Sequence, residues 1–296
     1  MKVLLVYNPI AGHKKAAKML PEVISYFSEN KVDVDLKQTK FPGHGRDIVS
    51  KADFNKYAGI VAAGGDGTVF EVINGFYLNK STKKIPVGIV PQGTANAFMR
   101  DLELVGSAWR DAVNIISDGK TRKVDVGQFI IDNKDYYFLN IMGFGFVTDV
   151  VETAIRFKAF GNIAYTFGVL QRILFLKDYR LTIEADGKTI ERQNNFVEIS
   201  NTRWASNFLM APNAEMDDGF LDVTLANSLT RRRLLKIFPK VFTGEHIKEP
   251  EIETFQAKKI YFETDVPKIL APDGELIGTT PVEVNCLHKD LELFWK

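Results

Sequence analysis

About 120 residues at the start of the chain alternate between short apolar runs and segments with helical spacing, and this alternation limits the folds open to it. Val3 to Tyr7 and Gly59 to Ala63 are apolar runs typical of strands that are buried on both faces. Between them, apolar residues from Ala16 to Phe27 recur on one face of a helix. Strands that alternate with helices predict a mostly parallel sheet with helices on both faces, an α/β domain of three layers.

Small residues follow three of the predicted strands at the point where each strand ends. The first strand runs into Asn8-Pro9-Ile10-Ala11-Gly12, the third into Gly64-Gly65-Asp66-Gly67-Thr68 and the fourth into Pro91-Gln92-Gly93-Thr94-Ala95-Asn96. Parallel sheets bind ligands beyond the carboxyl ends of their strands, so we expect these turns to converge, together with the one at Thr39. Glycine lets the backbone approach a ligand closely, and the following helix adds its positive dipole end. The turns therefore predict an anion site suited to phosphate.

Asp66 stands inside this predicted anion site and needs a separate explanation. A carboxylate repels phosphate, so we expect Asp66 to be an exposed loop residue that holds a magnesium ion or the ribose of a nucleotide. A plain turn between a strand and a helix is the simpler interpretation of the same five residues, because glycine-rich turns are common.

After about residue 120 the pattern changes to short strands joined by tight turns. Asp132-Asn133-Lys134-Asp135 and Ala185-Asp186-Gly187-Lys188 are typical of hairpin turns. Two helical stretches, Val151 to Leu176 and Thr230 to Phe242, interrupt the strands. We therefore expect an α/β domain over residues 1–122 and a β-rich domain, a sandwich, over residues 123–287.

Charge and cysteine content exclude several classes of protein. The 38 Lys and Arg residues nearly balance the 37 Asp and Glu residues, so the chain as a whole has no bias toward nucleic acid. Cys286 is the only cysteine, which favours a reducing, cytosolic location. The longest uncharged runs fall short of the ~20 apolar residues that a bilayer-spanning helix needs. A protein of this kind would reach lipids from the cytosol, at the membrane surface.

Several short motifs follow one another over nearly the whole chain. They are Asn8-Pro9 with Gly12, Ala62 to Thr68 with Glu71 and Asn74-Gly75, Gly93 to Asn96, Ala211-Pro212, Asp217 to Gly219 and Asp273-Gly274-Glu275. In this order and at this spacing they resemble the diacylglycerol kinase catalytic-domain superfamily, which includes bacterial diacylglycerol kinases, related lipid kinases and sphingosine kinases. Phe70 and Ala97 depart from the family pattern, which usually has Asn and Asp at these positions.

The resemblance implies an ATP-dependent lipid kinase, which transfers the γ-phosphate to a lipid hydroxyl. It also implies an NAD kinase-like α/β domain, to which a last strand near residues 288–296 returns. Asp66 would hold the active-site magnesium ion or the nucleotide, and Asn8, Thr39 and Glu71 would belong to the nucleotide site. The ATP phosphates would contact Gly64, Gly65, Gly67, Thr68 and Thr94.

The resemblance further implies that Glu275, with Asp273 beside it, is the general base. A lipid hydroxyl is a weak nucleophile, and a nearby carboxylate can accept its proton. Taken alone, Asp273-Gly274-Glu275 is typical of a hairpin turn.

An acidic segment from Ala214 to Phe220 has two interpretations. By resemblance it implies a structural magnesium site, formed by the side chain of Asp218 and the backbone carbonyls of Glu215 and Phe220. Oxygen ligands of this kind are the ones that hard cations prefer. Without the resemblance, a turn before the next strand explains the same residues.

Alternatives stay open at this point. The motif at residues 64–68 also occurs in NAD kinases, so an NAD kinase is one alternative, and a non-catalytic lipid- or nucleotide-binding module is another. The basic and apolar stretches at 151–180 and 230–242 suit either core-packed helices with a solvated face or contact with an anionic membrane. The expected partners are ATP and a membrane lipid, with no nucleic acid; a homodimer and the identity of the acceptor lipid are left open.

Overall fold

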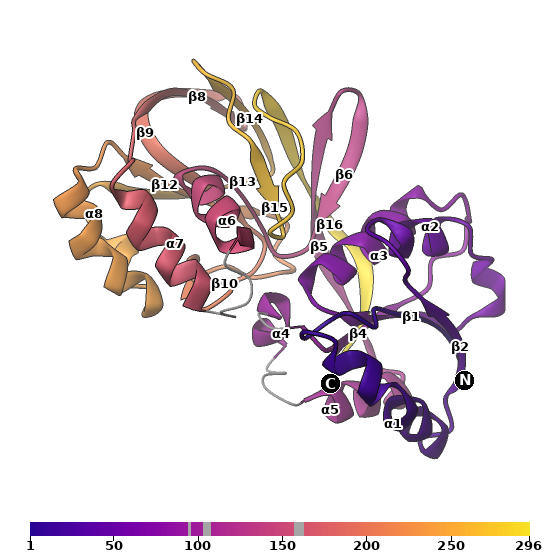
Figure 1. Ribbon diagram of the computed structural model, residues 1–296. Helices are drawn as coiled ribbons and strands as arrows, with labels where there is room; N and C mark the ends of the chain where they lie inside the picture. The colour runs from indigo at the N-terminus through magenta and orange to yellow at the C-terminus, as the bar shows by residue number, and fades with distance from the viewer. Residues whose placement is uncertain (94–95, 103–107, 157–162) are drawn as a thin grey trace. The chain divides into compact units, whose positions relative to one another are not determined.

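The computed structural model describes residues 1–93, 96–102, 108–156 and 163–296, and the chain divides into two compact units (Figure 1). Unit 1 contains Met1–Val124 and Lys289–Lys296, so it is built from two separate stretches of the sequence. Unit 2 contains the residues between them, Asp125–His288.

Unit 1 is a parallel sheet between two pairs of helices. Its strands lie in the order β4-β3-β1-β2, and the far end of β16 joins β4 in parallel where Leu293 pairs with Val87. Figure 1 shows α2 and α3 on one face of this sheet and α1 and α5 on the other. The elements are β1 (Lys2–Tyr7), α1 (Lys15–Glu29), β2 (Asp33–Gln38), α2 (His44–Ser50), η1 (Phe54–Lys56), β3 (Gly59–Gly64), α3 (Asp66–Leu78), β4 (Val87–Pro91), α4 (Ala97–Asp101) and α5 (Trp109–Asp118).

The composition of the strands explains this layering. All six residues of β3 and all five of β4 are buried, as expected for strands covered on both sides. On the helical layer, a Cβ atom at Gly75 would lie 2.6 Å from the carbonyl oxygen of Arg46, so the missing side chain lets α3 pack closely on α2. The predicted three-layer α/β fold is confirmed.

Unit 2 is antiparallel and β-rich. Its main path of strands is β13-β12-β9-β8-β14-β16, and β9 also pairs with β7, which in turn carries β15. The elements are β5 (Thr121–Ile131), β6 (Lys134–Phe138), β7 (Ile141–Gly145), α6 (Phe146–Arg156), α7 (Ile163–Ile173), β8 (Tyr179–Ala185), β9 (Lys188–Ser200), β10 (Trp204–Ala205), β11 (Phe208–Leu209), β12 (Leu221–Asn227), α8 (Arg231–Ile237), η3 (Phe238–Phe242), η4 (Glu245–Lys248), β13 (Ile252–Ala257), β14 (Lys259–Thr264), β15 (Leu270–Pro272) and β16 (Val282–Phe294).

Two hydrophobic cores lie on the two faces of β9. Val197 and Ile199 belong to the core inside the sandwich, whereas Phe196 belongs to a second core shared with α6, α7 and α8. Alternate residues of a strand point to opposite faces, which is why the whole second half of β9 is buried. The predicted β-rich sandwich is confirmed. The helical stretch predicted over 151–176 begins earlier, at Phe146, and contains two helices that pack on each other.

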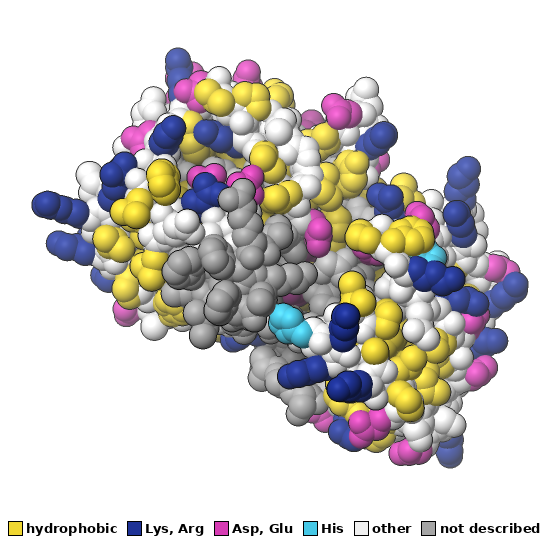
Figure 2. Space-filling view, viewed as in Figure 1, with side chains coloured by type: hydrophobic (Ala, Val, Ile, Leu, Met, Phe, Trp, Pro, Cys, Tyr) yellow, Lys and Arg dark blue, Asp and Glu magenta, His cyan; other side chains and the backbone are white. Residues whose placement is uncertain are grey.

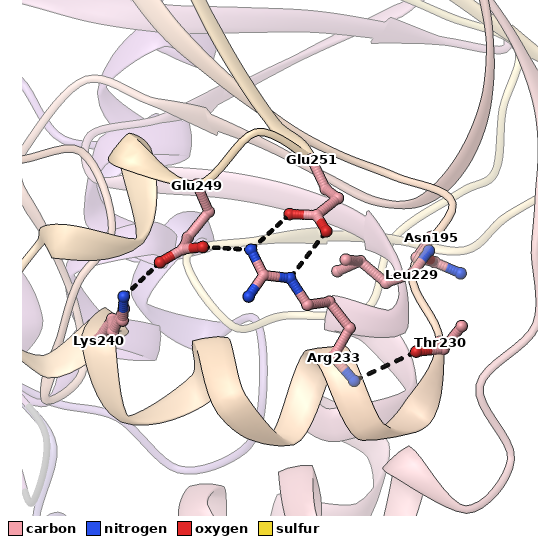
Figure 3. A network of polar contacts seen from close by, with 7 residues as sticks. All are labelled: Asn195, Leu229, Thr230, Arg233, Lys240, Glu249 and Glu251. Atoms are coloured by element: carbon pink, nitrogen blue, oxygen red, sulfur yellow. Dashed lines mark hydrogen bonds and ion pairs between the residues drawn. The ribbon is translucent and has the colours of Figure 1, made fainter.

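The basic segment at 230–242 forms α8 and η3. Figure 2 shows basic side chains beside hydrophobic ones at the left edge of the view, where α8 lies in Figure 1. Arg231 and Arg232 are exposed. Arg233 instead turns toward the chain and is bound by two carboxylates, with its Nε 2.7 Å and its Nη2 2.9 Å from Glu251 and a further bond to Glu249 (Figure 3).

Among the described residues, no helix has both the length and the apolar composition that crossing a bilayer requires.

Candidate functional site

The three small-residue turns of unit 1 converge at the carboxyl edge of the sheet. The side-chain Nδ2 of Asn8 donates to Thr68 Oγ1 at 3.0 Å, which joins the first turn to the third. The backbone N–H groups of Gln92 and Gly93 both donate to the carbonyl oxygen of Gly64, at 2.8 and 3.1 Å, which joins the third turn to the fourth. The turns therefore lie together, as their positions in the sequence predict.

Glycine is required where two of these turns touch. A Cβ atom at Gly93 would lie 2.4 Å from the Cα of Gly65, closer than any real contact of this kind. At Gly12 the backbone adopts φ +56°, and a Cβ atom there would lie 2.6 Å from the carbonyl oxygen of Gln92. The missing side chains leave backbone on the surface of the turns, which suits close approach of an anion.

Asp66 is not the exposed loop carboxylate that the sequence predicts. Its Oδ1 accepts a hydrogen bond of 2.9 Å from the backbone N–H of Ala97, the first residue of α4. Burial raises the pKa of Asp66 to about 6, while the bond from Ala97 acts in the opposite direction. Asp66 thus ties the third turn to the fourth. Thr94, predicted to contact the ATP phosphates, falls outside the described residues.

Glu71 fastens a second helix to this edge of the sheet. Its two carboxylate oxygens accept hydrogen bonds from the backbone N–H groups of Gly43 and Gly45, at 2.6 and 2.7 Å, where α2 begins. Thr39 lies just after β2, and its N–H donates to the carbonyl oxygen of Tyr7 at 2.8 Å. Glu71 therefore holds the segment between Thr39 and α2 in place.

In unit 2, Asp273 and Glu275 have different surroundings. The Asp273 carboxylate accepts three backbone hydrogen bonds of 3.0–3.1 Å, from Leu139, Asn140 and Ile141. Glu275 is exposed, and its backbone N–H donates to the carbonyl oxygen of Pro272 at 2.8 Å. Asp273 therefore fixes the turn, and Glu275 is presented at its surface.

The loop predicted to hold a structural magnesium ion is acidic and well ordered by side-chain contacts. Asp218 Oδ1 accepts from the N–H of Phe220 at 2.9 Å, and its Oδ2 accepts from Gln256 Nε2 at 3.1 Å. Burial, with the charges of Asp218 and Glu215, raises the pKa of neighbouring Asp222 to about 6, while the hydrogen bond from Gln256 acts in the opposite direction. The described residues contain no group of three or more His, Cys, Asp or Glu side chains arranged around a metal position. The predicted magnesium site has only one carboxylate, that of Asp218, and two backbone carbonyls, so it would not form such a group. The negative charge around Asp218 suits a cation.

Asp125 supports this loop and was missed from the sequence. It is fully buried, and its oxygens accept from the N–H of Gly219 at 2.6 Å and contact Nδ1 of His288 at 2.9 Å. One feature of the sequence could have identified Asp125 as a buried contact residue: it stands between two valines, Val124 and Val126, inside a predicted strand. Charged residues are seldom fully buried without partners, so such a position indicates a specific contact.

Comparisons with known proteins agree with this architecture. Residues 2–129 match the model of the diacylglycerol kinase catalytic domain, and residues 141–295 match that of the YegS C-terminal NAD kinase beta sandwich-like domain. The chain belongs to the diacylglycerol kinase catalytic-domain family. Curated relatives of this family member include a diacylglycerol kinase of Staphylococcus carnosus, 28% identical over 98% of this chain and 94% of that protein. Sphingosine kinase 1 of Arabidopsis thaliana is also 28% identical, over 98% of this chain and 71% of that protein.

Solved structures place the family member in the same fold. A Bacillus anthracis protein, provisionally assigned as a diacylglycerol kinase, superimposes with a TM-score of 0.80 at 26% identity, covering 100% of this chain and 97% of that one. An NAD kinase from Archaeoglobus fulgidus in complex with ATP gives a TM-score of 0.56 at 11% identity, covering 99% and 93%. The second likeness concerns the fold alone.

Proposed function

We propose that this family member is an ATP-dependent lipid kinase, which transfers the γ-phosphate of ATP to a hydroxyl group of a membrane lipid. The observation that carries the proposal is the convergence of three glycine-containing turns at the carboxyl edge of the sheet in unit 1. Two relatives named for lipid kinases support the acceptor class. The acceptor is a lipid with a free hydroxyl beside its acyl or alkyl chains.

The ATP phosphates bind against the backbone of the turns at Gly64 to Thr68 and at Gly93, with Thr94 beside them. Asn8 and Thr39 lie at the rim of this site, and Glu71 acts by holding the segment that follows Thr39. Phosphoryl transfer depends mainly on positioning and on neutralising charge. Asp66 is the carboxylate that would hold a magnesium ion here, and such an ion would neutralise phosphate charge when bound.

Glu275 accepts the proton of the lipid hydroxyl. Of the two carboxylates in its turn, it is the exposed one, whereas the oxygens of Asp273 are already engaged by three backbone N–H groups. A general base must be within reach of the substrate hydroxyl, and the exposure of Glu275 favours it over Asp273. A structural magnesium ion would be held by the side chain of Asp218 and the carbonyls of Glu215 and Phe220. The enzyme works from the cytosolic side, at the membrane surface.

A panel of acceptors tests this function directly. The purified protein is incubated with labelled ATP and magnesium and with diacylglycerol, monoacylglycerol, a sphingoid base or phosphatidylglycerol in mixed micelles, and with NAD in solution. We expect label in at least one lipid and none in NAD. Label in NAD alone would identify an NAD kinase, and ATP binding without transfer to any acceptor would identify a non-catalytic binding module.

A further inference from the structure

A cavity of about 410 Å³ opens in unit 2, away from the catalytic turn. It lies among the end of β7, the first turns of α6, the segment after α7 and the residues before β15. Ile269 is at one end of β15 and Asp273 at the other, so about 13 Å of extended chain separates the cavity from the proposed base. Its polar lining consists of Thr148, Asp149, Glu152, Arg172, Lys177 and Lys268, together with Tyr179.

Two polar side-chain groups in this lining have no hydrogen-bond or ion-pair partner within the part of the chain that the structure describes. The Tyr179 side chain is only 4% exposed, and its hydroxyl makes no hydrogen bond there. Gly145, at φ +78°, leaves room for this hydroxyl, because a Cβ atom at that position would lie 2.5 Å from it. Asp149 is half-buried, and no ion pair or hydrogen bond reaches its carboxylate from the described residues. Buried polar groups are normally hydrogen-bonded, so the Tyr179 hydroxyl indicates a ligand that supplies a partner. The half-buried carboxylate of Asp149 lies in the same lining and can accept from such a ligand.

The charges of the cavity are of both signs. Arg172 and Glu152 compensate each other at 3.3 Å, and Arg172 also donates to Thr153 Oγ1 at 2.6 Å. Lys268 places its ammonium group 4.6 Å from the ring centre of Tyr179, and Lys177 is exposed at the margin. The lysines suit a phosphate, and Asp149 suits a hydroxyl or ammonium donor a few atoms away.

Exposed apolar side chains surround the opening. Leu174 is 61% exposed and Phe175 is 60% exposed, at the C-terminal end of the α7 region, and Val266 and Ile269 are exposed on the other side. Apolar side chains that project next to lysines are typical of a surface that contacts the interface of a membrane. A soluble phosphate ester would make no use of them.

We propose that this cavity binds the headgroup of a membrane phospholipid that carries hydroxyl or ammonium donors in addition to its phosphate. The phosphate lies against Lys177 and Lys268, the donors reach Asp149 and the Tyr179 hydroxyl, and Leu174 and Phe175 enter the acyl region. The bound lipid is a second lipid, not the one that is phosphorylated, because the cavity lies at the opposite end of β15 from Glu275. The site therefore anchors unit 2 to the membrane.

Vesicle binding without nucleotide tests the site. Binding of the full chain is measured to phosphatidylcholine vesicles that contain equal amounts of either phosphatidylglycerol or phosphatidic acid, since only the first headgroup has hydroxyls beyond its phosphate. We expect tighter binding to phosphatidylglycerol, and we expect Asp149→Asn and Tyr179→Phe each to remove that preference. The double variant Lys177→Gln/Lys268→Gln should weaken binding to both kinds of vesicle about thirtyfold, since each charge near an anionic surface contributes about 1 kcal/mol.

Matched control variants distinguish binding at this cavity from non-specific electrostatic attraction of the protein to anionic vesicles. Lys134→Gln/Lys188→Gln removes the same charge from two exposed positions on other hairpins of unit 2, and it should leave the headgroup preference intact. Soluble glycerophosphoglycerol should not compete below millimolar concentrations, because it lacks acyl chains. If it competes as well as vesicles do, the ligand is a free phosphate ester. A preference that survives both Asp149→Asn and Tyr179→Phe would overturn the assignment. Since Tyr179→Phe removes a single atom and Lys177 is exposed, loss of folding does not confound these readouts.

Discussion

Asp273 and Glu275 stand two residues apart, and their hydrogen bonds give them different expected roles. Glu275→Gln keeps the size of the side chain but cannot accept a proton at neutral pH. We expect turnover to fall about 10²–10⁴-fold. The apparent affinity for ATP should change little, because the proposed function has the ATP phosphates bind in unit 1. Steady-state kinetics with a lipid identified by the acceptor panel measures both quantities.

Asp273→Asn is the control for this experiment. The single amide oxygen can keep the bonds from Asn140 and Ile141, which one carboxylate oxygen accepts in the parent, but the bond from the Leu139 N–H to the other oxygen is lost. The turn should therefore loosen and the melting temperature should fall. Turnover should drop less than in Glu275→Gln. The opposite ranking would make Asp273 the base, and two fully active variants would remove the catalytic role of the turn.

Glu198 is a single buried side chain that should make the stability of the fold depend on pH. It is 2% exposed on β9, and burial raises its pKa from 4.5 to about 8. Between these values the folded chain holds a proton that the unfolded chain releases, so the free energy of unfolding falls as the pH rises, by at most about 1.4 kcal/mol per pH unit. Urea unfolding of Glu198→Gln at pH 5.5, 7 and 8.5 should show a flatter profile than the parent. An unchanged profile would assign the dependence to other groups.

At the scale of residues, the sequence predicted positions better than contacts. The turns at Asn8, Gly64 and Gln92 were found because glycine and small residues mark sharp turns wherever they occur. That Asp66 bonds to Ala97, or that Glu71 holds Gly43 and Gly45, depends on residues 26 to 31 positions apart, which no local pattern specifies. Asp149 and Tyr179 were missed for the same reason.

At the scale of elements, the segment of α8 and η3 carries two kinds of basic side chain: some form ion pairs within the protein, and others are exposed to solvent. Arg233 is bound to Glu249 and Glu251, and Lys240 to Glu249, whereas Arg231 and Arg232 are exposed (Figure 3). We expect Arg233→Gln to lower the melting temperature, because the two carboxylates lose their shared partner. Arg231→Gln/Arg232→Gln should leave it unchanged and weaken binding to anionic vesicles by up to about 1 kcal/mol per charge. Differential scanning fluorimetry and vesicle sedimentation distinguish these outcomes, and the reverse pattern would contradict the assignment.

The periodicity of the sequence predicted which segments are helices and which are strands. It did not predict which residues of a helix form internal ion pairs and which face the solvent. A repeat of basic residues in Arg231, Arg232 and Arg233 looks uniform in the sequence. The three arginines differ in the side of the helix on which they lie. Arg233 faces the segment that carries Glu249 and Glu251, and the other two do not. The helical stretch near residue 151 was predicted to start five residues too late for a different reason: strand β7 runs directly into α6 at Phe146, so no turn residues separate the two elements.

At the scale of the whole molecule, the acidic loop at Asp218 predicts linkage between magnesium and stability. If the loop binds the ion only when folded, magnesium at 100 times its dissociation constant should stabilise the parent by about 2.7 kcal/mol. Asp218→Ala should lose this shift and should melt at a lower temperature even without the ion, since its bonds to Phe220 and Gln256 are lost. Thermal melts with magnesium, with calcium and with chelator measure it. Equal shifts in both proteins would rule out a site at this loop.

Unit 1 is completed by residues that follow unit 2 in the chain, and this order matters while the protein is being made. Phe294 packs where a side chain on Gly59 or Gly88 would otherwise stand, and the N–H of Trp295 donates to the carbonyl oxygen of Lys120 at 2.9 Å. The ribosome synthesises Phe294 more than 200 residues after Gly59 and Gly88, the strand residues that it covers. During translation, the sheet next to β4 therefore stays uncovered while all of unit 2 emerges and can already fold. A nascent chain is then expected to acquire a protease-resistant sandwich before it acquires the site proposed to bind ATP.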